Sequence, residues 1–268
     1  ANNALIVSAL GANTVTLSNA GAANGAAEVE NYVLANGANT FTVGASGQSV
    51  TGGSGDDSLK TGALATVSGA LDGVSGNDTL TVDQNATVSA TLSNIDAVLL
   101  ANNVSITTSL ANNTLITSAL GSNTVTLSAA GAASGAAEVE NYVLANGSNT
   151  FTVGAAAQNV TGGTGDDNLK TGALTTISGT LDGVSGNDSV SVEQSATLSA
   201  ILNNIDAVNL DNDVNLTTSI TNNALIAGAA GTNTVTLSNA GTASGAAAVE
   251  NYQLANGANT FTLGAAAQ

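Results

Sequence analysis

The chain has 268 residues, with two lysines, no arginine, histidine, cysteine or proline, and 19 acidic residues, which give a formal net charge of −17. Nucleic-acid binding requires clustered Lys and Arg, so we expect no nucleic-acid partner. The lack of Cys excludes a disulfide framework and thiolate metal sites. No apolar run reaches the roughly 18–20 residues of a membrane-spanning helix, so we also expect no membrane span.

The sequence repeats with a period of about 110 residues, shown by the hexapeptide NTVTLS at 13–18, 123–128 and 233–238. We expect 1–268 to form one continuous β-solenoid, because repeats of this kind stack on their neighbours. In this frame the parts are the end of a preceding repeat (1–12), repeat 1 (13–122), repeat 2 (123–232) and a partial repeat 3 (233–268). Both ends fall inside the repeat, which predicts an excerpt from a longer array.

Short segments that alternate apolar with small polar residues predict strands inside each repeat. In chain order, the first repeat carries TVTL at 14–17, TFTV at 40–43, SLKT at 58–61, TLTV at 79–82 and SITT at 105–108. Further strands are expected at 29–34, 95–100 and 205–210, and the Ala-rich stretch 19–27 is interpreted as a bulged loop or a short helical turn. The pattern predicts an all-β, parallel β-solenoid of the β-roll or β-helix type, with coils of about 22 residues and five coils per repeat.

One nonapeptide carries recognisable chemistry. Residues 52–60 read GGSGDDSLK and 162–170 read GGTGDDNLK, while 73–81 (GVSGNDTLT) and 183–191 (GVSGNDSVS) differ at the second position. These segments resemble the RTX family of secreted bacterial β-roll proteins, which bind calcium in the turns of a G-G-x-G-x-D-x-apolar-x repeat. The wider sequence is similar in style to RTX-like solenoids of bacterial S-layer proteins and large adhesins.

The resemblance implies Ca²⁺ as the cofactor, and the chemistry agrees, because calcium prefers carboxylate and carbonyl oxygens. Asp57 and Asp78 lie one coil apart, so we expect an ion between them, and the same between Asp167 and Asp188. The predicted metal-site residues are Gly53, Gly55, Asp56, Asp57, Gly76, Asn77, Asp78, Gly163, Gly165, Asp166, Asp167, Gly186, Asn187 and Asp188. Asp72 and Asp182 are candidate additional ligands, and the glycines are expected to supply carbonyls.

An alternative needs no metal. Asp and Asn side chains close turns by bonding the backbone, and Asn occupies the equivalent place in other coils, as at Asn39 and Asn149. We therefore expect calcium at some coils and amide hydrogen bonding at others.

The expected function is structural rather than enzymatic. We expect an extracellular repeat protein of a bacterial surface layer, fibre or sheath that binds calcium ions and self-associates, with cell-surface polysaccharide as a further candidate partner. The alternatives are the stalk of a giant RTX-type adhesin and, from the recurrent Thr-x-Thr segments, an ice-binding solenoid.

Overall fold

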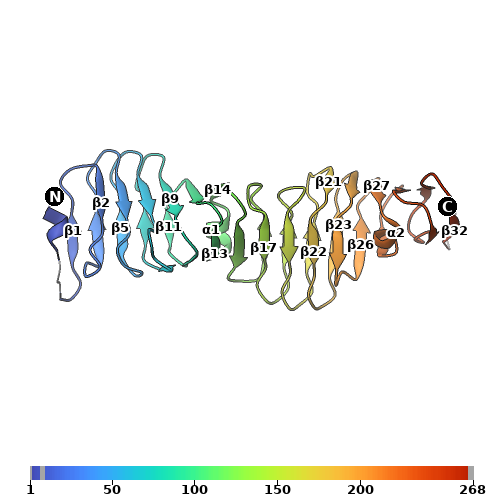
Figure 1. Cartoon of the computed structure of the whole chain (residues 1–268), viewed down its shortest axis with the longest axis horizontal. Helices are drawn as coiled ribbons and strands as arrows, with labels where there is room; N and C mark the ends of the chain where they lie inside the picture. Colours follow the sequence, from blue (N-terminus) through green and yellow to red (C-terminus); the bar gives the residue numbers. More distant parts are fainter. Residues whose placement is uncertain (1, 7–9, 265–268) are drawn as a thin grey trace. The chain divides into compact units, whose positions relative to one another are not determined.

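The computed structural model describes residues 2–6 and 10–264, and it divides the chain into two compact units, Ala1–Ser128 and Ala129–Gln268. Each unit is a parallel β-solenoid whose short strands stack coil upon coil (Figure 1). The all-β prediction is therefore confirmed. The boundary between the units follows Ser128 rather than the repeat boundary after 122, and the expectation of one continuous solenoid over 1–268 stays a prediction.

The first unit contains short strands and two helical turns. They are η1 (Asn2–Leu5), β1 (Thr14–Thr16), β2 (Ala22–Asn24), β3 (Asn31–Val33), β4 (Thr40–Thr42), β5 (Ser49–Thr51), β6 (Ser58–Lys60), β7 (Thr66–Val67), β8 (Leu71–Asp72), β9 (Thr79–Val82), β10 (Ala86–Val88), β11 (Leu92–Ser93), β12 (Ala97–Leu100), β13 (Ser105–Thr108), α1 (Leu110–Asn113), β14 (Ile116–Ala119) and β15 (Thr124–Leu127). The strands at 14–17, 29–34, 40–43 and 95–100 were all predicted, whereas β2 lies in the Ala-rich stretch 19–27, which was wrongly interpreted as a bulged loop or a short helical turn.

The second unit repeats the pattern. Its elements are β16 (Ala132–Ser134), β17 (Asn141–Val143), β18 (Thr150–Thr152), β19 (Asn159–Thr161), β20 (Asn168–Lys170), β21 (Thr176–Ile177), β22 (Thr180–Asp182), β23 (Ser189–Val192), β24 (Ala196–Leu198), β25 (Ile201–Asn203), β26 (Ala207–Leu210), β27 (Asn215–Thr218), α2 (Ile220–Asn223), β28 (Ile226–Ala229), β29 (Thr234–Leu237), β30 (Thr242–Ser244), β31 (Asn251–Gln253) and β32 (Thr260–Thr262). No helix among the described residues is long and apolar enough to cross a membrane.

The coils are shorter than predicted. Successive partners along one sheet of the first unit are Ala23, Phe41, Leu59, Leu80, Val98 and Ile116. Along this sheet, neighbouring coils are offset by 18 residues, as from Phe41 to Leu59, except for the longer offset of 21 from Leu59 to Leu80. The next repeat begins the same series at Ala133, so six coils rather than five fill each repeat. The predicted number of coils per repeat, and with it the predicted coil length, was wrong.

The error came from mixing different sides of the coil. The predicted series placed the strand at 14–17 beside those at 40–43, 58–61 and 79–82. The structure assigns β1 to the sheet β1-β3-β5-β8-β11 and the others to the sheet β14-β12-β9-β6-β4-β2. The strand at 105–108 belongs to a third series that contains β7, β10, β13 and β15. The longest apparent steps therefore ran from one side of a coil to another side of the next coil.

The core consists of rows of apolar side chains that point into the solenoid from the central positions of the strands. Phe41, Leu59 and Leu80 are fully buried and follow one another in register. Tyr32 packs beside Phe41 with ring centroids 4.8 Å apart, and Tyr142 packs beside Phe151 at the same distance. Burial of these apolar side chains, together with parallel backbone hydrogen bonds, holds each coil on the next and fixes the register of the turns.

Candidate cation site and corner ladder

The predicted motif turns stack on one corner of each unit. In the first unit, the turn at 52–57 precedes β6 and the turn at 73–78 precedes β9. Ser54 and Ser75 form a parallel bridge between the turns, and the N–H of Gly55 donates to the carbonyl of Ser75 at 2.8 Å. Thr164 and Ser185 repeat the bridge in the second unit. The sequence therefore predicted correctly that successive motif turns meet.

These turns contribute to a row of hydrogen-bonded polar side chains, which we call the corner ladder: Asn39, Asp57 and Asp78, which are buried, and Asp96, which is exposed. Asn39 donates its backbone N–H and its Nδ2 to Asp57 Oδ1, at 2.9 and 2.7 Å. Asp57 and Asp78 donate their backbone N–H groups to Asp78 Oδ1 and Asp96 Oδ2, each at 2.7 Å. Each rung thus accepts hydrogen bonds from the preceding coil.

The ladder recurs one repeat later. Asn149, Asp167, Asp188 and Asp206 make the equivalent backbone N–H contacts, each at 2.8 Å. Asp96 and Asp206 were not predicted as part of the site. Their signal is in the sequence, because each follows its neighbouring ladder aspartate by 18 residues, the length of most coils.

Asp57 has hydrogen-bond donors on both carboxylate oxygens. Oδ1 accepts from Asn39 and Oδ2 accepts the N–H of Gly53 at 3.0 Å, and Gly163 donates in the same way to Asp167. These donors stabilise a carboxylate without a metal ion. Gly53 and Gly163, expected to supply carbonyl oxygens, present N–H groups to the aspartates instead. This arrangement is the backbone-closing alternative that the sequence left open.

Asp78 is different, because its Oδ2 is buried and has no hydrogen-bond partner. Val74 occupies the position of Gly53 but has a φ of 72°, and its N–H donates to Asp72 Oδ1 at 3.0 Å rather than to Asp78. A β-branched residue at positive φ is a rare, strained conformation. Within the described residues, Asp78 Oδ2 and Asp188 Oδ2 are the two buried side-chain atoms that lack a partner.

The pKa values of Asp78 and Asp188 agree with burial of a carboxylate that has an unpartnered oxygen. Burial raises the pKa of Asp78, the N–H of Asp57 lowers it, and the charges of Asp57, Asp96 and Asp56 raise it further. The pKa of Asp188 is raised for the same reasons. A cation or a proton at the free oxygen would relieve this destabilisation.

A glycine brings a second oxygen to the same place. A Cβ added to Gly73 would lie 2.4 Å from Asp78 Oδ2 and 2.3 Å from the carbonyl oxygen of Asn94. Both oxygens therefore face the α-carbon of Gly73, and only glycine leaves room for them. Gly183 has the same relationship to Asp188 and Asn204, at 2.4 Å for each oxygen.

The remaining predicted residues lie outside the corner ladder. Asp56 Oδ1 accepts the N–H of the exposed Asn77 at 2.9 Å, and Asp166 accepts that of Asn187 at 2.8 Å. Gly55, Gly76, Gly165 and Gly186 adopt positive φ values between 119° and 137°, which shape the turns. Asp72 bonds Val74 and Asn94, as Asp182 bonds Val184 and Asn204.

Side chains alone do not assemble a metal centre here. The described residues hold no group of three or more Asp, Glu, His or Cys placed to bind one ion. A cation at Asp78 would therefore depend on backbone carbonyls such as that of Asn94, which suits a hard ion that prefers oxygen.

No protein family model, no curated protein and no solved structure matches this chain.

Proposed function

We propose that this chain is a calcium-stabilised structural segment of an extracellular bacterial surface layer, fibre or sheath, and that it has no catalytic role. The observation that carries the proposal is the recurrence of the corner ladder at Asn39–Asp96 and, one repeat later, at Asn149–Asp206, with matching backbone contacts. The ladder is repeated with the same residue types at every position. Such repetition favours a role in building a long structure over a role in catalysis. The resemblance of 52–60 and 162–170 to RTX repeats supports secretion and calcium.

We place the proposed calcium at the second motif turn of each pair. Asp78 Oδ2 is buried and unpartnered, which makes it the carboxylate oxygen of the pair that is left without a positive or hydrogen-bonding partner. Asp57 fits less well, because its oxygens already accept N–H groups. When bound, calcium would supply positive charge beside the two buried carboxylates of Asp57 and Asp78 and couple ion binding to folding.

The test is folding and assembly with and without calcium. Far-UV circular dichroism and sedimentation of the chain in chelator, followed by calcium addition, should show recovered β-structure and larger assemblies. Equal β-structure and equal sedimentation under both conditions would contradict the calcium-stabilised role.

An ice-binding role is a second candidate, and a specific arrangement favours it. Outward-facing threonines form a file in strict register in each unit, because each is the direct partner of the next on the adjacent strand. The two files are Thr66, Thr87, Thr107 and Thr126, and Thr176, Thr197, Thr217 and Thr236. Thermal hysteresis of the purified chain tests it, with Thr87→Leu, Thr107→Leu, Thr197→Leu and Thr217→Leu combined as the variant that should abolish the activity, because it interrupts both files.

The stalk of a giant adhesin is an alternative function, because a stalk would also be built from many stacked repeats. A stalk would extend as isolated fibrils, whereas a layer or sheath component would join neighbouring molecules. Electron microscopy of the native cell surface distinguishes them.

A further inference from the structure

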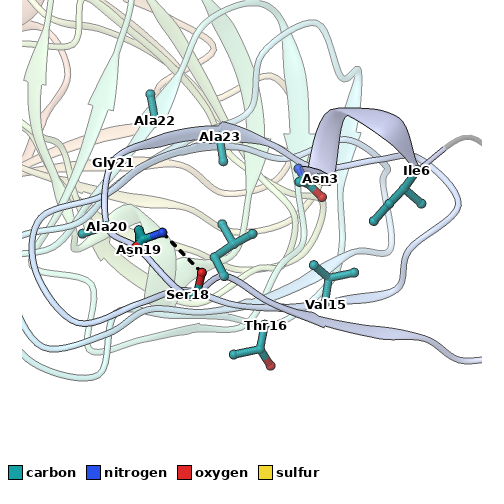
Figure 2. Close-up of a pocket in the computed structure, with 11 residues that line it drawn as sticks. Asn3, Ile6, Val15, Thr16, Ser18, Asn19, Ala20, Gly21, Ala22 and Ala23 are labelled. Atoms are coloured by element: carbon teal, nitrogen blue, oxygen red, sulfur yellow. Dashed lines mark hydrogen bonds between the residues drawn. The ribbon is translucent and has the colours of Figure 1, made fainter. Parts of the chain in front are cut away.

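One face of each unit consists of hydroxyl side chains, and we call it the hydroxyl face. In the first unit it is formed by β7, β10, β13 and β15, whose outward threonines are direct partners in register: Thr66, Thr87, Thr107 and Thr126. Figure 2 shows the alternation behind such a face at β1, the strand equivalent to β15, where Val15 and Thr16 point to opposite sides. A second, exposed row lies two residues further along the chain: Ser68, Ser89 and Ser128.

The second unit presents the same face. Its threonines are partners in register on β21, β24, β27 and β29, and exposed serines again form the second row: Thr176, Thr197, Thr217 and Thr236, with Ser178, Ser199 and Ser238. The stretches that form the two faces contain no charged residue: 65–68, 85–89, 105–109 and 124–128, and 175–178, 195–199, 215–219 and 234–238. The other two faces of the first unit each carry a charge, at Lys60 on β6 and at Asp72 on β8.

The acidic residues gather on the opposite side of the coil. The strands β9, β10 and β11 form the three sides of one coil and belong to three different sheets. The corner ladder lies where β8 turns into β9, so the side formed by β10 is across the core from it. Most acidic residues of the first unit surround that corner: Asp56, Asp57, Asp72, Asp78 and Asp96. Each unit therefore has an acidic edge and, opposite to it, an uncharged face.

From this distribution we propose that the hydroxyl face is the surface by which two copies of the chain pack side by side. A threonine or serine hydroxyl both donates and accepts hydrogen bonds, so the face is complementary to a copy of itself. Contact through this face keeps the acidic edges of both copies on the outside of the pair. Two chains of net charge −17 repel each other least in that arrangement.

The size of the hydroxyl face sets the strength of the contact. Four strands spaced by ~4.8 Å, each with about five residues of ~3.3 Å, give roughly 300 Å² for each unit. A standard interface buries about 800 Å² on each partner, so a single pair of faces should associate weakly. In a long repeat array, many such contacts act together and give strong lateral association. The proposal rests on the structural role proposed above and names the surface through which copies join.

Sedimentation velocity over a range of concentrations tests the proposal with two matched sets of charge variants. The first set places Asp at directly partnered positions of the hydroxyl face: Thr87→Asp, Thr107→Asp, Thr197→Asp and Thr217→Asp. The control set adds the same charge at directly partnered positions of another face: Thr40→Asp, Ser58→Asp, Thr150→Asp and Asn168→Asp. In calcium buffer at about 0.15 M salt, where distant charges are screened, the native chain and the control should self-associate. The hydroxyl-face variant should associate on the order of ten-fold or more weakly, because like charges then meet in the contact.

A second measurement does not depend on added charge. The chain contains no cysteine, so single substitutions report which surfaces meet. A mixture of Thr87→Cys and Thr107→Cys chains should form disulfide-linked dimers under mild oxidation faster than a mixture of Thr40→Cys and Ser58→Cys chains. Far-UV circular dichroism equal to that of the native chain shows that a variant has folded.

A native chain that stays monomeric up to about 1 mM would overturn the proposal, as would equal cross-linking at both faces. Thermal hysteresis that the hydroxyl-face variant loses, in a native chain that does not associate, would assign the face to ice and would also overturn it. Calcium binding together with equal association of the two charge variants would reject this contact and retain the calcium role. Association through the hydroxyl face in a chain that binds no calcium would reject the calcium role and retain this contact.

Discussion

Gly53 and Val74 occupy the same position in successive turns of one corner, yet their N–H groups point to different acceptors. Gly53 donates to the buried Oδ2 of Asp57, whereas Val74, at a φ of 72°, donates to Asp72 and leaves Oδ2 of Asp78 unpartnered. Gly at this position of the motif thus accompanies a carboxylate whose two oxygens both accept hydrogen bonds, and Val accompanies one whose Oδ2 accepts none.

Replacing Val74 by Gly should stabilise the calcium-free chain. Glycine tolerates positive φ without strain and also allows the turn to rotate its N–H toward Asp78 Oδ2, as Gly53 does for Asp57. We expect the free energy of unfolding to rise by about 1–2 kcal/mol in chelator, measured by urea denaturation. Val74→Ala keeps a Cβ at a residue with positive φ, so much of the backbone strain remains and stability should change less. A destabilised V74G chain in chelator would contradict this account of the turn.

The pH dependence of stability should carry the signature of Asp78. Burial and neighbouring carboxylates raise the pKa of Asp78 in the folded state, so the folded chain binds a proton more tightly than the unfolded chain. In calcium-free buffer, stability should therefore be highest below the ordinary Asp pKa and fall as the pH rises through the raised value. The doubly substituted D78N/D188N chain should lose most of this decline. If the stability of that variant fell with pH as steeply as that of the native chain, groups other than Asp78 and Asp188 would cause the decline.

Glycine at position 53 should be essential to the stacking of the turns. A Cβ there would lie 2.3 Å from the carbonyl oxygen of Ala35, a backbone atom that cannot move away cheaply. Gly53→Ala should destabilise the first unit by several kcal/mol, on the scale of overpacking in a close-packed interior. Gly47→Ala is the matched control, because nothing lies within 4 Å of its Cβ position. Thermal unfolding of the two variants checks the difference, and equal losses would count against close packing as the cause.

The hydroxyl of Tyr252 should connect the last residue of α2 to the turn that follows β30. It donates to Asn223 Oδ1 at 3.1 Å and accepts the N–H of Ala246 at 2.8 Å. Tyr252→Phe keeps the ring contact with Phe261 and removes both bonds, so we expect a loss of about 1–2 kcal/mol. Hydrogen exchange at the Ala246 amide should accelerate in the variant. Unchanged exchange at that amide would show that the bond contributes nothing to local order.

The sequence predicted the fold class and the meeting of Asp57 with Asp78, because alternating strands and glycine-rich turns are local signals. It missed the coil length, since strands on different sides of a coil look alike: 14–17 and 40–43 share the pattern T-x-T-apolar but belong to different sheets. It also could not separate Asp57 from Asp78. Among the residues that define the motif, the two turns differ only by Gly53 and Val74, and the consequence depends on the backbone conformation that Val74 adopts in the stacked turn.

Calcium titration of the intact chain and of D78N/D188N by isothermal calorimetry tests the central claim most directly. We predict about one bound ion per motif pair in the native chain, none in the variant, and an increase in Tm of about 5–10 °C at a calcium concentration near 100 times Kd. No heat of binding in the native chain, or the same binding in D78N/D188N, would contradict the assignment of Asp78 and Asp188 to a calcium site.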